Sequence, residues 1–405
     1  MRLHRNLVFA VIDSLNDIFN NHKYADKVIT NSLKRDKRWG ARDRAFIAET
    51  TYEIVRWKRL YSEIAEVKDH FNRENLFKIF CVWATLRGIK LPDWKQFENT
   101  PTRRIKGRFS ELSKSRKLKE SIPDWMDEMA SKELGEDLWT KEIQALNIQA
   151  PVVLRANYLK TTSKKLQEIL FKEEIDCLEI KGYSHALQLS ERKNVFRSEA
   201  FKNGLFEVQD ASSQLVAEYL DVKAGMRVVD TCAGAGGKTL HLAALTENKG
   251  QIIAMDIYGN KLKELKRRAR RAGAHNIETR TIESTKDIKK LHNKADRVLI
   301  DAPCSGLGIL RRNPDAKWKL QPEFIENIKK TQQEILNQYS KMLRPGGKLV
   351  YATCSILPSE NQEQVALFLK GEEGKKFELA KDKKILSHIS GYDGFYMAQL
   401  IKKDA

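Results

Sequence analysis

Two cysteines each follow a predicted buried strand closely enough to take part in chemistry. Cys304 lies in Asp301-Ala302-Pro303-Cys304-Ser305-Gly306, and Cys354 lies in Tyr351-Ala352-Thr353-Cys354-Ser355. A residue just past the carboxyl end of a strand in an α/β sheet lies on the loop beside the crevice where such folds bind ligands. Because thiolates are nucleophiles, two thiols in this position predict chemistry rather than packing.

A glycine-rich turn upstream predicts a cofactor site. The predicted strand ending at Asp230 is followed by Thr231-Cys232-Ala233-Gly234-Ala235-Gly236-Gly237-Lys238-Thr239. A P-loop needs a glycine where Cys232 stands, and a dinucleotide-binding turn needs a third glycine where Thr239 stands, so both alternatives are disfavoured. Asp256 ends the next predicted strand, about 20 residues on, where a carboxylate can accept both hydroxyls of a ribose. S-adenosylmethionine, which has the ribose but no phosphate, fits this pattern; the alternatives are a purely structural turn and a helix-capping aspartate.

The elements that must position these residues form an α/β domain over residues 210–405. Strands are predicted at 226–230, 251–256, 297–301 and 348–351, with helices at 238–245, 258–272 and 322–343 between them. Alternating strands and helices predict a mostly parallel, doubly wound, Rossmann-like sheet. A last strand at 395–402 is expected to be antiparallel.

Three further segments are predicted before this domain. Residues 1–100 show apolar residues at helical spacing and predict a helical bundle. Residues 101–122 are rich in Lys and Arg and are interpreted as a basic linker that orders on RNA. Residues 123–209 predict a small α/β module of the kind that binds RNA.

Composition limits the partners and the compartment. Lys and Arg outnumber Asp and Glu by 73 to 54, which gives a formal net charge of +19 and favours a nucleic-acid partner. No apolar run reaches the roughly 20 residues needed to span a bilayer. The five cysteines include no Cys-x-x-Cys pair and no histidine at metal-binding spacing, so we expect no disulfide, no metal and a reducing, cytoplasmic location. A monomer without a membrane partner is expected.

These motifs together resemble the Nop/Sun family of RNA (cytosine-5)-methyltransferases, which includes bacterial 16S ribosomal RNA methyltransferases. The resemblance covers about residues 125–405. It rests on the cofactor turn and on Asp301-Ala302-Pro303-Cys304-Ser305-Gly306-Leu307-Gly308, Arg311-Arg312-Asn313-Pro314-Asp315-Ala316-Lys317-Trp318, Arg344-Pro345-Gly346-Gly347 and Thr353-Cys354-Ser355. The N-terminal helices are similar, less distinctly, to the NusB-like RNA-binding bundle that some bacterial members carry.

The resemblance implies a role for each cysteine. Cys354 is the nucleophile that adds to carbon 6 of cytosine, Cys304 assists release of the product, and Asp301 contacts the ring nitrogen and faces the cofactor. S-adenosyl-L-methionine is implied as the methyl donor, bound by the turn from Cys232 to Lys238 and by Asp256. Lys238 begins the helix beside the cofactor, and its charge has two equal interpretations, an aid to thiol ionisation and an ordinary solvated helix surface. Cys232 matches the family's loop and is expected to be packed rather than reactive.

The chain departs from the family pattern at two positions. Ala235 stands where family loops often have proline, and Thr281-Ile282-Glu283 lacks the usual Gly-Asp pair near the adenine, which leaves Glu283 as a stand-in. Ribosomal RNA is the leading substrate. The alternatives are transfer RNA, a DNA methyltransferase that uses Cys304 as nucleophile, and a catalytically silent RNA-binding assembly factor.

Overall fold

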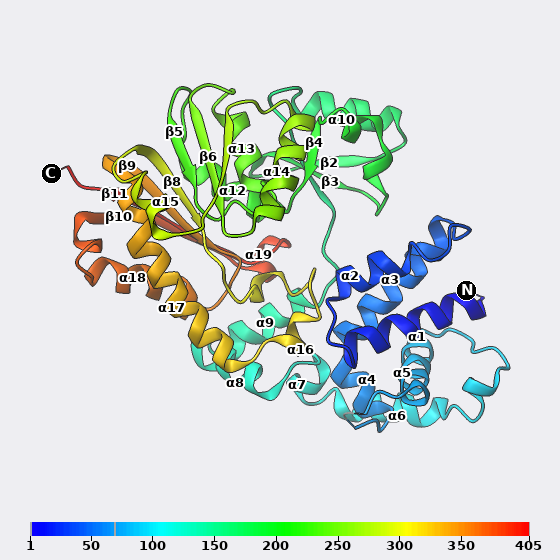
Figure 1. Ribbon diagram of the computed structural model, residues 1–405. Coiled ribbons are helices and arrows are strands. Elements are labelled where there is room, and N and C mark those ends of the chain that lie inside the picture. Colours follow the sequence, from blue (N-terminus) through cyan, green and yellow to red (C-terminus); the bar gives the residue numbers. More distant parts are fainter. Residues whose placement is uncertain (1, 69, 405) are drawn as a thin grey trace. The chain divides into compact units, whose positions relative to one another are not determined.

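The protein forms two compact units that do not follow the order of the chain. A computed structural model describes residues 2–68 and 70–404. Unit 1 comprises the described residues up to 148 together with residues 310–322, and unit 2 comprises residues 149–309 and 323–404. The units are described separately below, with their elements labelled as in Figure 1.

Unit 1 is a helical bundle, as the apolar spacing of its first hundred residues predicts. Buried side chains recur every three or four residues along its long helices, and they meet in one hydrophobic core. Within residues 2–68 and 70–404, no helix is long and apolar enough to cross a membrane. The helices that precede residue 149 are α1 (Arg5–Phe19), α2 (Ala25–Ser32), α3 (Ala41–Arg56), α4 (Lys58–Ile64), α5 (Arg73–Leu86), α6 (Thr102–Leu112), α7 (Arg116–Lys119), α8 (Asp124–Leu134) and α9 (Glu136–Leu146).

The segment interpreted as a basic linker, residues 101–122, is folded into the bundle. It contains α6 and α7, and Ile105 of α6 is buried in the core of unit 1. Arg104 and Arg108 of α6 both form ion pairs with Glu66, at 2.6 and 3.1 Å. The linker interpretation was wrong. One apolar side chain and two ion-paired arginines attach α6 to the rest of the bundle, and such contacts cannot be read from a basic composition.

Residues 310–322, which we call the strap, complete unit 1 from a distant part of the sequence. The strap includes α16 (Ala316–Lys319), and its Lys317 is fully buried. The Lys317 ammonium nitrogen lies 2.6 Å from Oδ1 of Asn147 and 3.1–3.3 Å from three main-chain carbonyls, those of Arg56, Glu120 and Ser121. Trp318 donates its indole N–H to the carbonyl of Val55 at 2.7 Å. These bonds hold the strap among helices that precede it by at least 160 residues.

Unit 2 begins with a four-stranded antiparallel sheet in the order β2-β3-β1-β4. Its strands pack against α10 (Ser163–Lys172) and α11 (Glu199–Lys202) around a small core of their own. The predicted module at 123–209 contains this sheet, and its first two helices, α8 and α9, pack with unit 1. The strands are β1 (Val153–Ala156), β2 (Cys177–Ile180), β3 (Tyr183–Leu189) and β4 (Phe206–Val208).

The second sheet of unit 2 is the predicted doubly wound sheet. Its seven strands have the order β10-β11-β9-β8-β5-β6-β7, parallel from β9 to β7, while β11 is antiparallel as predicted. The strands are β5 (Arg227–Asp230), β6 (Gln251–Asp256), β7 (Ile277–Thr281), β8 (Ala295–Asp301), β9 (Leu343–Thr353), β10 (Phe377–Ile385) and β11 (Phe395–Lys402). Sequence analysis did not predict β10, an edge strand whose central residues are mostly exposed and charged.

Helices cover both faces of this sheet (Figure 1). Val228 belongs to the hydrophobic core that includes residues of α12 (Ala211–Tyr219), α13 (Gly237–Leu245) and α14 (Gly259–Ala272). The next residue, Val229, belongs to the core that includes residues of α15 (Thr285–Lys289), α17 (Pro322–Tyr339) and α18 (Gln362–Lys370). The alternation follows from the two-residue period of a strand. The strand order reverses between β5 and β8, so a ligand-binding crevice is expected beyond the carboxyl ends of these two strands.

Candidate active site

The glycine-rich turn between β5 and α13 brings main chain close to a helix of the same unit. Gly236 has φ of 88°, in the left-handed region, and a Cβ atom there would lie 2.6 Å from Cγ of Leu265 in α14. The turn therefore needs glycine at this position for both backbone conformation and space. Arg155 of β1 donates a hydrogen bond to the carbonyl of Gly237, which connects the small sheet to the turn.

Asp256 holds the same turn from the end of β6. One carboxylate oxygen accepts the N–H of Gly234 and the other accepts the N–H of Tyr258, each at 2.8 Å. Asp256 is therefore fixed in orientation while it lines the cavity described next. Each carboxylate oxygen can accept more than one hydrogen bond, so both remain able to accept a hydroxyl.

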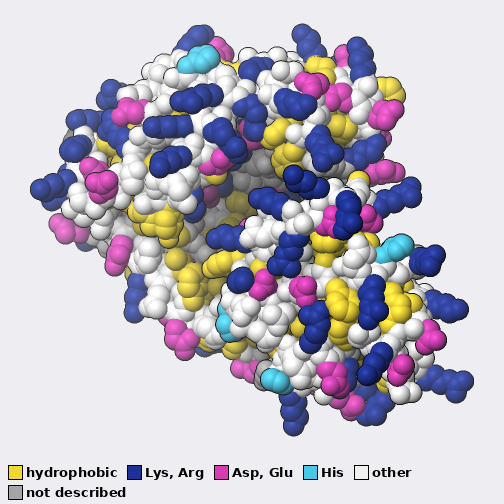
Figure 2. All heavy atoms as spheres, turned by 45° about the vertical axis from the view of Figure 1, so that its right-hand side comes forward, with side chains coloured by type: hydrophobic (Ala, Val, Ile, Leu, Met, Phe, Trp, Pro, Cys, Tyr) yellow, Lys and Arg dark blue, Asp and Glu magenta, His cyan; other side chains and the backbone are white. Residues whose placement is uncertain are grey.

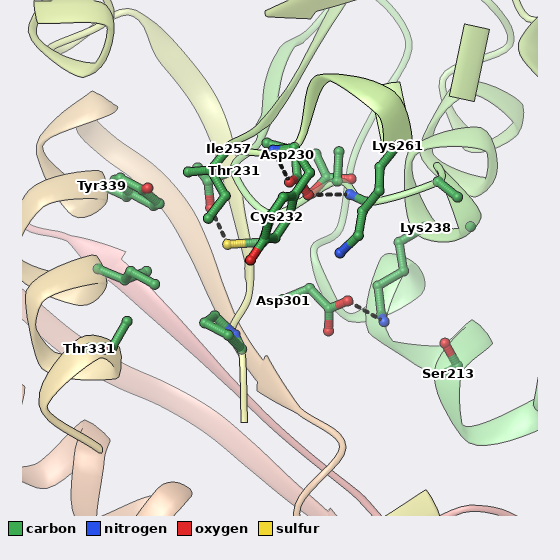
Figure 3. A pocket seen from close by; sticks show the side chains of 18 of the residues that line it. Ser213, Asp230, Thr231, Cys232, Lys238, Ile257, Lys261, Asp301, Thr331 and Tyr339 are labelled. Carbon is green, nitrogen blue, oxygen red and sulfur yellow. Dashed lines mark hydrogen bonds and ion pairs between the residues drawn. The ribbon is translucent and has the colours of Figure 1, made fainter. Parts of the chain in front are cut away.

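A cavity of about 630 Å³ opens beyond the carboxyl ends of β5, β6 and β8. Most of the predicted cofactor residues line it, and Figure 3 shows several of their side chains. The predicted residues that line it are Cys232, Ala233, Gly234, Ala235, Gly237, Lys238, Asp256 and Asp301. Gly236 instead faces α14. The cavity is thus formed where the strand order predicted it.

Asp230 gives this cavity a polar group that lacks a partner. Its side chain is buried, and Oδ2 accepts the hydroxyl of Thr239 at 2.7 Å, while Oδ1 has no hydrogen-bond partner. Burial raises the pKa of Asp230 to about 7, and the nearby Asp301 charge adds to the rise. A ligand that carries an ammonium group would supply the missing partner for Oδ1 and the opposite charge.

Lys238 and Asp301 form an ion pair at the edge of the cavity. The Lys238 ammonium nitrogen lies 2.6 Å from Oδ2 of Asp301, and both side chains point toward each other in Figure 3. Burial acts to lower the pKa of Lys238, but the charges of Asp301 and Cys354 outweigh it and raise that pKa above its usual value. Lys238 is therefore a cation held against the Asp301 carboxylate, close enough to Cys354 for its charge to interact with that residue.

The fold brings the two predicted cysteines together although 50 residues separate them in sequence. The Sγ atoms of Cys304 and Cys354 lie 3.4 Å apart and share a hydrogen bond. This hydrogen bond, burial, and the charges of Cys354 and Glu360 raise the pKa of Cys304 well above its ordinary value. Cys304 consequently keeps its proton, and its thiol lies in direct contact with the Cys354 sulfur.

Gly308 and Gly394 allow the main chain of the Cys304 loop to approach the Cys354 loop. The N–H of Gly308 donates to the carbonyl of Cys354 at 2.9 Å, and the carbonyl of Gly308 accepts the N–H of Gly394 at 2.8 Å. Neither cysteine lines the cofactor cavity, but Asp301 and Pro303 of the Cys304 loop do. The thiol pair is thus placed next to the cavity rather than inside it.

Two residues that were predicted to bind the cofactor, Cys232 and Glu283, differ from the other predicted cofactor residues in protonation or in position. Burial raises the pKa of the Cys232 thiol, which is therefore held protonated and unreactive in agreement with its predicted packing role. Glu283 is exposed and lines a separate hollow with Arg280, Asp287 and Lys290. The interpretation of Glu283 as a cofactor carboxylate stays a prediction: Glu283 is not among the residues that line the cavity, although Ile282 before it donates its N–H to the carbonyl of Asp256 at 3.0 Å.

Other lining residues were missed by sequence reasoning. Ile257 and Tyr258, directly after Asp256, are more than half exposed and contribute apolar surface to the cavity. Their position after a strand-end aspartate was a usable signal. The α17 residues Thr331, Ile335 and Tyr339 line the opposite wall, and nothing in their helical pattern distinguishes them from ordinary core residues.

A second polar cluster joins the small sheet to the large one. Nδ1 of His185 in β3 lies 2.7 Å from Nε2 of His241 in α13 and 3.7 Å from a carboxylate oxygen of Glu218 in α12. Burial lowers the pKa of His185 to about 4 and that of His241 well below its usual value, so both imidazoles are neutral. Their sequence spacing showed no such grouping, because the three residues come from three separate elements.

Comparison with known proteins identifies relatives of two parts of the chain. A family model described as "16S rRNA methyltransferase RsmB/F" matches residues 217–401, and one described as "Methyltr_RsmF/B-like, ferredoxin-like domain" matches residues 122–196. The Bacillus subtilis protein named "Probable ribosomal RNA small subunit methyltransferase B" is 31% identical over 299 residues, which are 70% of this chain and 67% of that protein. The Yersinia enterocolitica "Ribosomal RNA small subunit methyltransferase B" is 36% identical over 275 residues, or 66% of this chain and 63% of that protein.

Solved structures share the fold. "Crystal Structure of PH0851" superposes with a TM-score of 0.83 at 23% identity and covers 99% of this chain and all of that one. A "Methyltransferase Homolog Protein from Pyrococcus Horikoshii" superposes with a TM-score of 0.63 at 26% identity and covers 73% of this chain and 99% of that one. The cavity described above thus lies in a fold that is found among methyltransferases.

Proposed function

Because the chain belongs to the 16S rRNA methyltransferase RsmB/F family, we propose that it methylates carbon 5 of a cytosine in 16S ribosomal RNA through a covalent cysteine adduct. The chain is an RNA methyltransferase that uses S-adenosyl-L-methionine. The observation that carries the proposed mechanism is the 3.4 Å contact between two sulfur atoms of which one is held protonated.

The cavity residues match the parts of S-adenosyl-L-methionine. Asp256 would accept the ribose hydroxyls, and the unpartnered Oδ1 of Asp230 would accept the ammonium group of the methionine end. Ile257 and Tyr258 offer apolar surface to the adenine. When bound, S-adenosyl-L-methionine supplies an electrophilic methyl group on a sulfonium sulfur.

Cys354 is the nucleophile in this proposal. Its thiolate forms a bond to carbon 6 of the cytosine, and the electron pair of the 5,6 double bond makes carbon 5 reactive enough to take the methyl group. Asp301 contacts the ring nitrogen, which takes a proton from solvent as the adduct forms and returns it when carbon 5 takes the methyl group; the ion pair with Lys238 holds that carboxylate in place. The cationic Lys238 also stabilises negative charge on Cys354 before the attack.

Cys304 is the base that releases the product. While Cys354 is a thiolate, its charge and its hydrogen bond keep the proton on Cys304. Both influences disappear once the Cys354 sulfur is bonded to carbon, so the pKa of Cys304 falls and its proton leaves to solvent. The Cys304 thiolate then removes the proton from carbon 5, the double bond re-forms, and the carbon–sulfur bond breaks to return Cys354 as a thiolate. Formation of the bond between Cys354 and carbon 6 thereby converts Cys304 into the base that the release step needs.

The surface supports a nucleic-acid substrate. Lys and Arg side chains are spread over the face shown in Figure 2, with fewer Asp and Glu side chains between them. The outer side of α14 in unit 2 carries five exposed basic residues: Lys261, Lys263, Lys266, Arg267 and Arg270. Basic clusters of this kind bind RNA phosphates. All five cysteines are unpaired, and we propose that the protein acts in the reducing cytoplasm.

The proposal is tested with a radiolabelled methyl donor. Wild type, Cys354→Ala and Cys304→Ala are incubated separately with 16S ribosomal RNA, transfer RNA and DNA, and both label and covalent RNA–protein adduct are measured. We expect labelling of ribosomal RNA by wild type, none by Cys354→Ala, and an accumulated adduct with Cys304→Ala. An adduct that forms with Cys354→Ala but not with Cys304→Ala reverses the two roles. Labelling of transfer RNA or DNA instead of ribosomal RNA would show that the substrate is that nucleic acid. No labelling of any of the three supports a catalytically silent RNA-binding protein.

A further inference from the structure

Glu360 is a buried carboxylate that none of the sequence motifs of the site includes. It ends the short helix η5 (Pro358–Glu360) after the Cys354 loop, and its side chain is fully buried. A buried carboxylate is costly unless its oxygens are hydrogen-bonded. Its partners therefore indicate why the chain places a charge there.

The partners of Glu360 come from both cysteine loops. Ser305, directly after Cys304, donates its main-chain N–H at 2.8 Å and its hydroxyl to the carboxylate. Ser355, directly after Cys354, donates its hydroxyl at 2.6 Å. Gln332 of α17 donates a fourth hydrogen bond at 3.1 Å. One carboxylate thus binds the residue that follows each thiol.

Asn361 strengthens the hold on the second loop. Its Oδ1 accepts the hydroxyl of Thr353, and its Nδ2 donates to the carbonyl of Ser355 at 3.0 Å. The residues before and after Cys354 are therefore both bonded to the Glu360-Asn361 pair. Cys354 itself stays free to react.

We propose that Glu360 is a positioning residue that fixes Cys304 and Cys354 as one unit, with their sulfur atoms at the separation that attack and release require. This proposal rests on the function proposed above in one respect, namely that both thiols act on the same base. The geometric part stands without it. Misplacement of a reacting group by 1 Å can lower a rate by about 100-fold, and removal of the carboxylate takes away the hydrogen bonds that hold Ser305 and Ser355 to one common anchor.

The charge of Glu360 has a separate effect from its geometry. The carboxylate contributes to keeping the proton on Cys304. The substitution Glu360→Gln separates the two effects. The amide oxygen can accept the N–H groups of Ser305 and Gln332, and the amide NH₂ can donate to the hydroxyls of Ser305 and Ser355, so four hydrogen bonds survive without the charge.

The experiment compares Glu360→Gln, Glu360→Ala and a matched control, Asp296→Asn. Asp296 is also a buried carboxylate of unit 2, but it lies at the start of β8 and pairs with Arg344, about 16 Å along the strand from Asp301. Each variant is treated with a short bifunctional alkylating reagent, and the cross-link between Cys304 and Cys354 is quantified by peptide mass spectrometry. Cofactor binding and rates of RNA methylation and adduct release are measured in parallel.

We expect Glu360→Ala to lose most of the cross-link, although each thiol still takes a single label, and to methylate about 100-fold more slowly with cofactor affinity within about twofold of wild type. Glu360→Gln should keep the cross-link and restore the rate to within several-fold. It should also move alkylation of Cys304 to lower pH. Asp296→Asn should behave as wild type in every thiol measurement.

The outcomes separate this proposal from the proposed function. Equal cross-linking and equal methylation in Glu360→Ala and wild type overturn the positioning role. Loss of the cross-link in Glu360→Ala, in a preparation whose wild type methylates no RNA, supports positioning and refutes the function. If Glu360→Ala does not fold, the double variant Ser305→Ala/Ser355→Ala removes both hydroxyl partners and is expected to show the same loss of cross-link. Retention of the cross-link in that variant also overturns the proposal.

Discussion

Gly308 offers a direct way to move the two cysteine loops apart. A Cβ atom at this position would lie 2.2 Å from the carbonyl oxygen of Gly394 and 2.8 Å from that of Cys354, whereas ordinary contacts begin at 3.4 Å. All of these neighbours are main-chain atoms, which cannot turn aside as a side chain can. In Gly308→Ala the Cys304 loop must therefore retreat by about 1 Å, the difference between the present and the ordinary contact distance.

The expected cost follows from this displacement. A retreat of about 1 Å lengthens the hydrogen bond from Gly308 to Cys354. It also moves Cys304 away from the cytosine whose carbon 5 it must deprotonate. We expect methylation to slow by about 100-fold, which corresponds to roughly 2.7 kcal/mol in the activation free energy. Overpacking should also lower the free energy of unfolding by about 1–3 kcal/mol. The cofactor cavity is not lined by Gly308, so cofactor affinity should change little.

The assay is single-turnover methylation of 16S ribosomal RNA with saturating cofactor, accompanied by a measurement of covalent adduct. Gly107→Ala is the matched control, because a Cβ at Gly107 of α6 meets no atom within 4 Å, and alanine in a helix is expected to be neutral or slightly stabilising. A Gly308→Ala protein that folds and methylates within threefold of wild type would refute the inference that the close approach of the two loops sets the rate.

Three further predictions concern the buried charges. Lys317→Met removes the donor that four buried acceptors share, of which the Glu120 carbonyl keeps a second donor in Asn147. It should lower the free energy of unfolding of unit 1 by about 3 kcal/mol in denaturant titration; an unchanged midpoint contradicts the role of this side chain. The pKa of Asp230 is about 7 in the folded protein, above the unfolded value of about 3.9. Thermal stability should therefore fall as the pH rises from 4 to 7, and it should fall less in Asp230→Asn. An equal loss of stability over this pH range in both proteins would count against the raised pKa. Lys238→Met leaves Asp301 without its lysine partner and should reduce the rate of methylation at least tenfold. Alkylation of Cys354 at neutral pH should also become slower. Unchanged alkylation would show that Lys238 does not stabilise the Cys354 thiolate.

The parts of the fold that could be predicted from sequence are those determined by local pattern. Apolar runs identified the central strands, because a strand buried on both faces needs apolar residues throughout. Glycine spacing identified the cofactor turn, since Gly236 adopts a backbone conformation that other residues rarely adopt. β10 escaped prediction because its exposed edge is charged, as edge strands commonly are.

The parts that could not be predicted depend on contacts between distant residues. Cys304 and Cys354 were identified from their motifs, but their sulfur contact needs the pairing of β8 with β9. Glu360 lies 55 residues from Ser305 in sequence, and no local pattern distinguishes a buried glutamate from an exposed one. The role of Glu283 stays a prediction, because it was transferred from a family pattern whose Gly-Asp pair this chain lacks, and its side chain lines a separate hollow.

The strap has a consequence for the order in which the protein is made. Synthesis from the N-terminus produces the helices of unit 1 first, yet Lys317 and Trp318, which bond to those helices, follow only after β5, β6, β7 and β8 have been translated. Until residue 322 leaves the ribosome, the carbonyls of Arg56, Glu120 and Ser121 lack the ammonium that they bind in the finished protein. Unit 1 therefore cannot complete its packing until the strap, which directly follows the Cys304 loop, has been synthesised. A chain released before residue 317 would lack the buried contacts of Lys317 and Trp318 in its helical bundle.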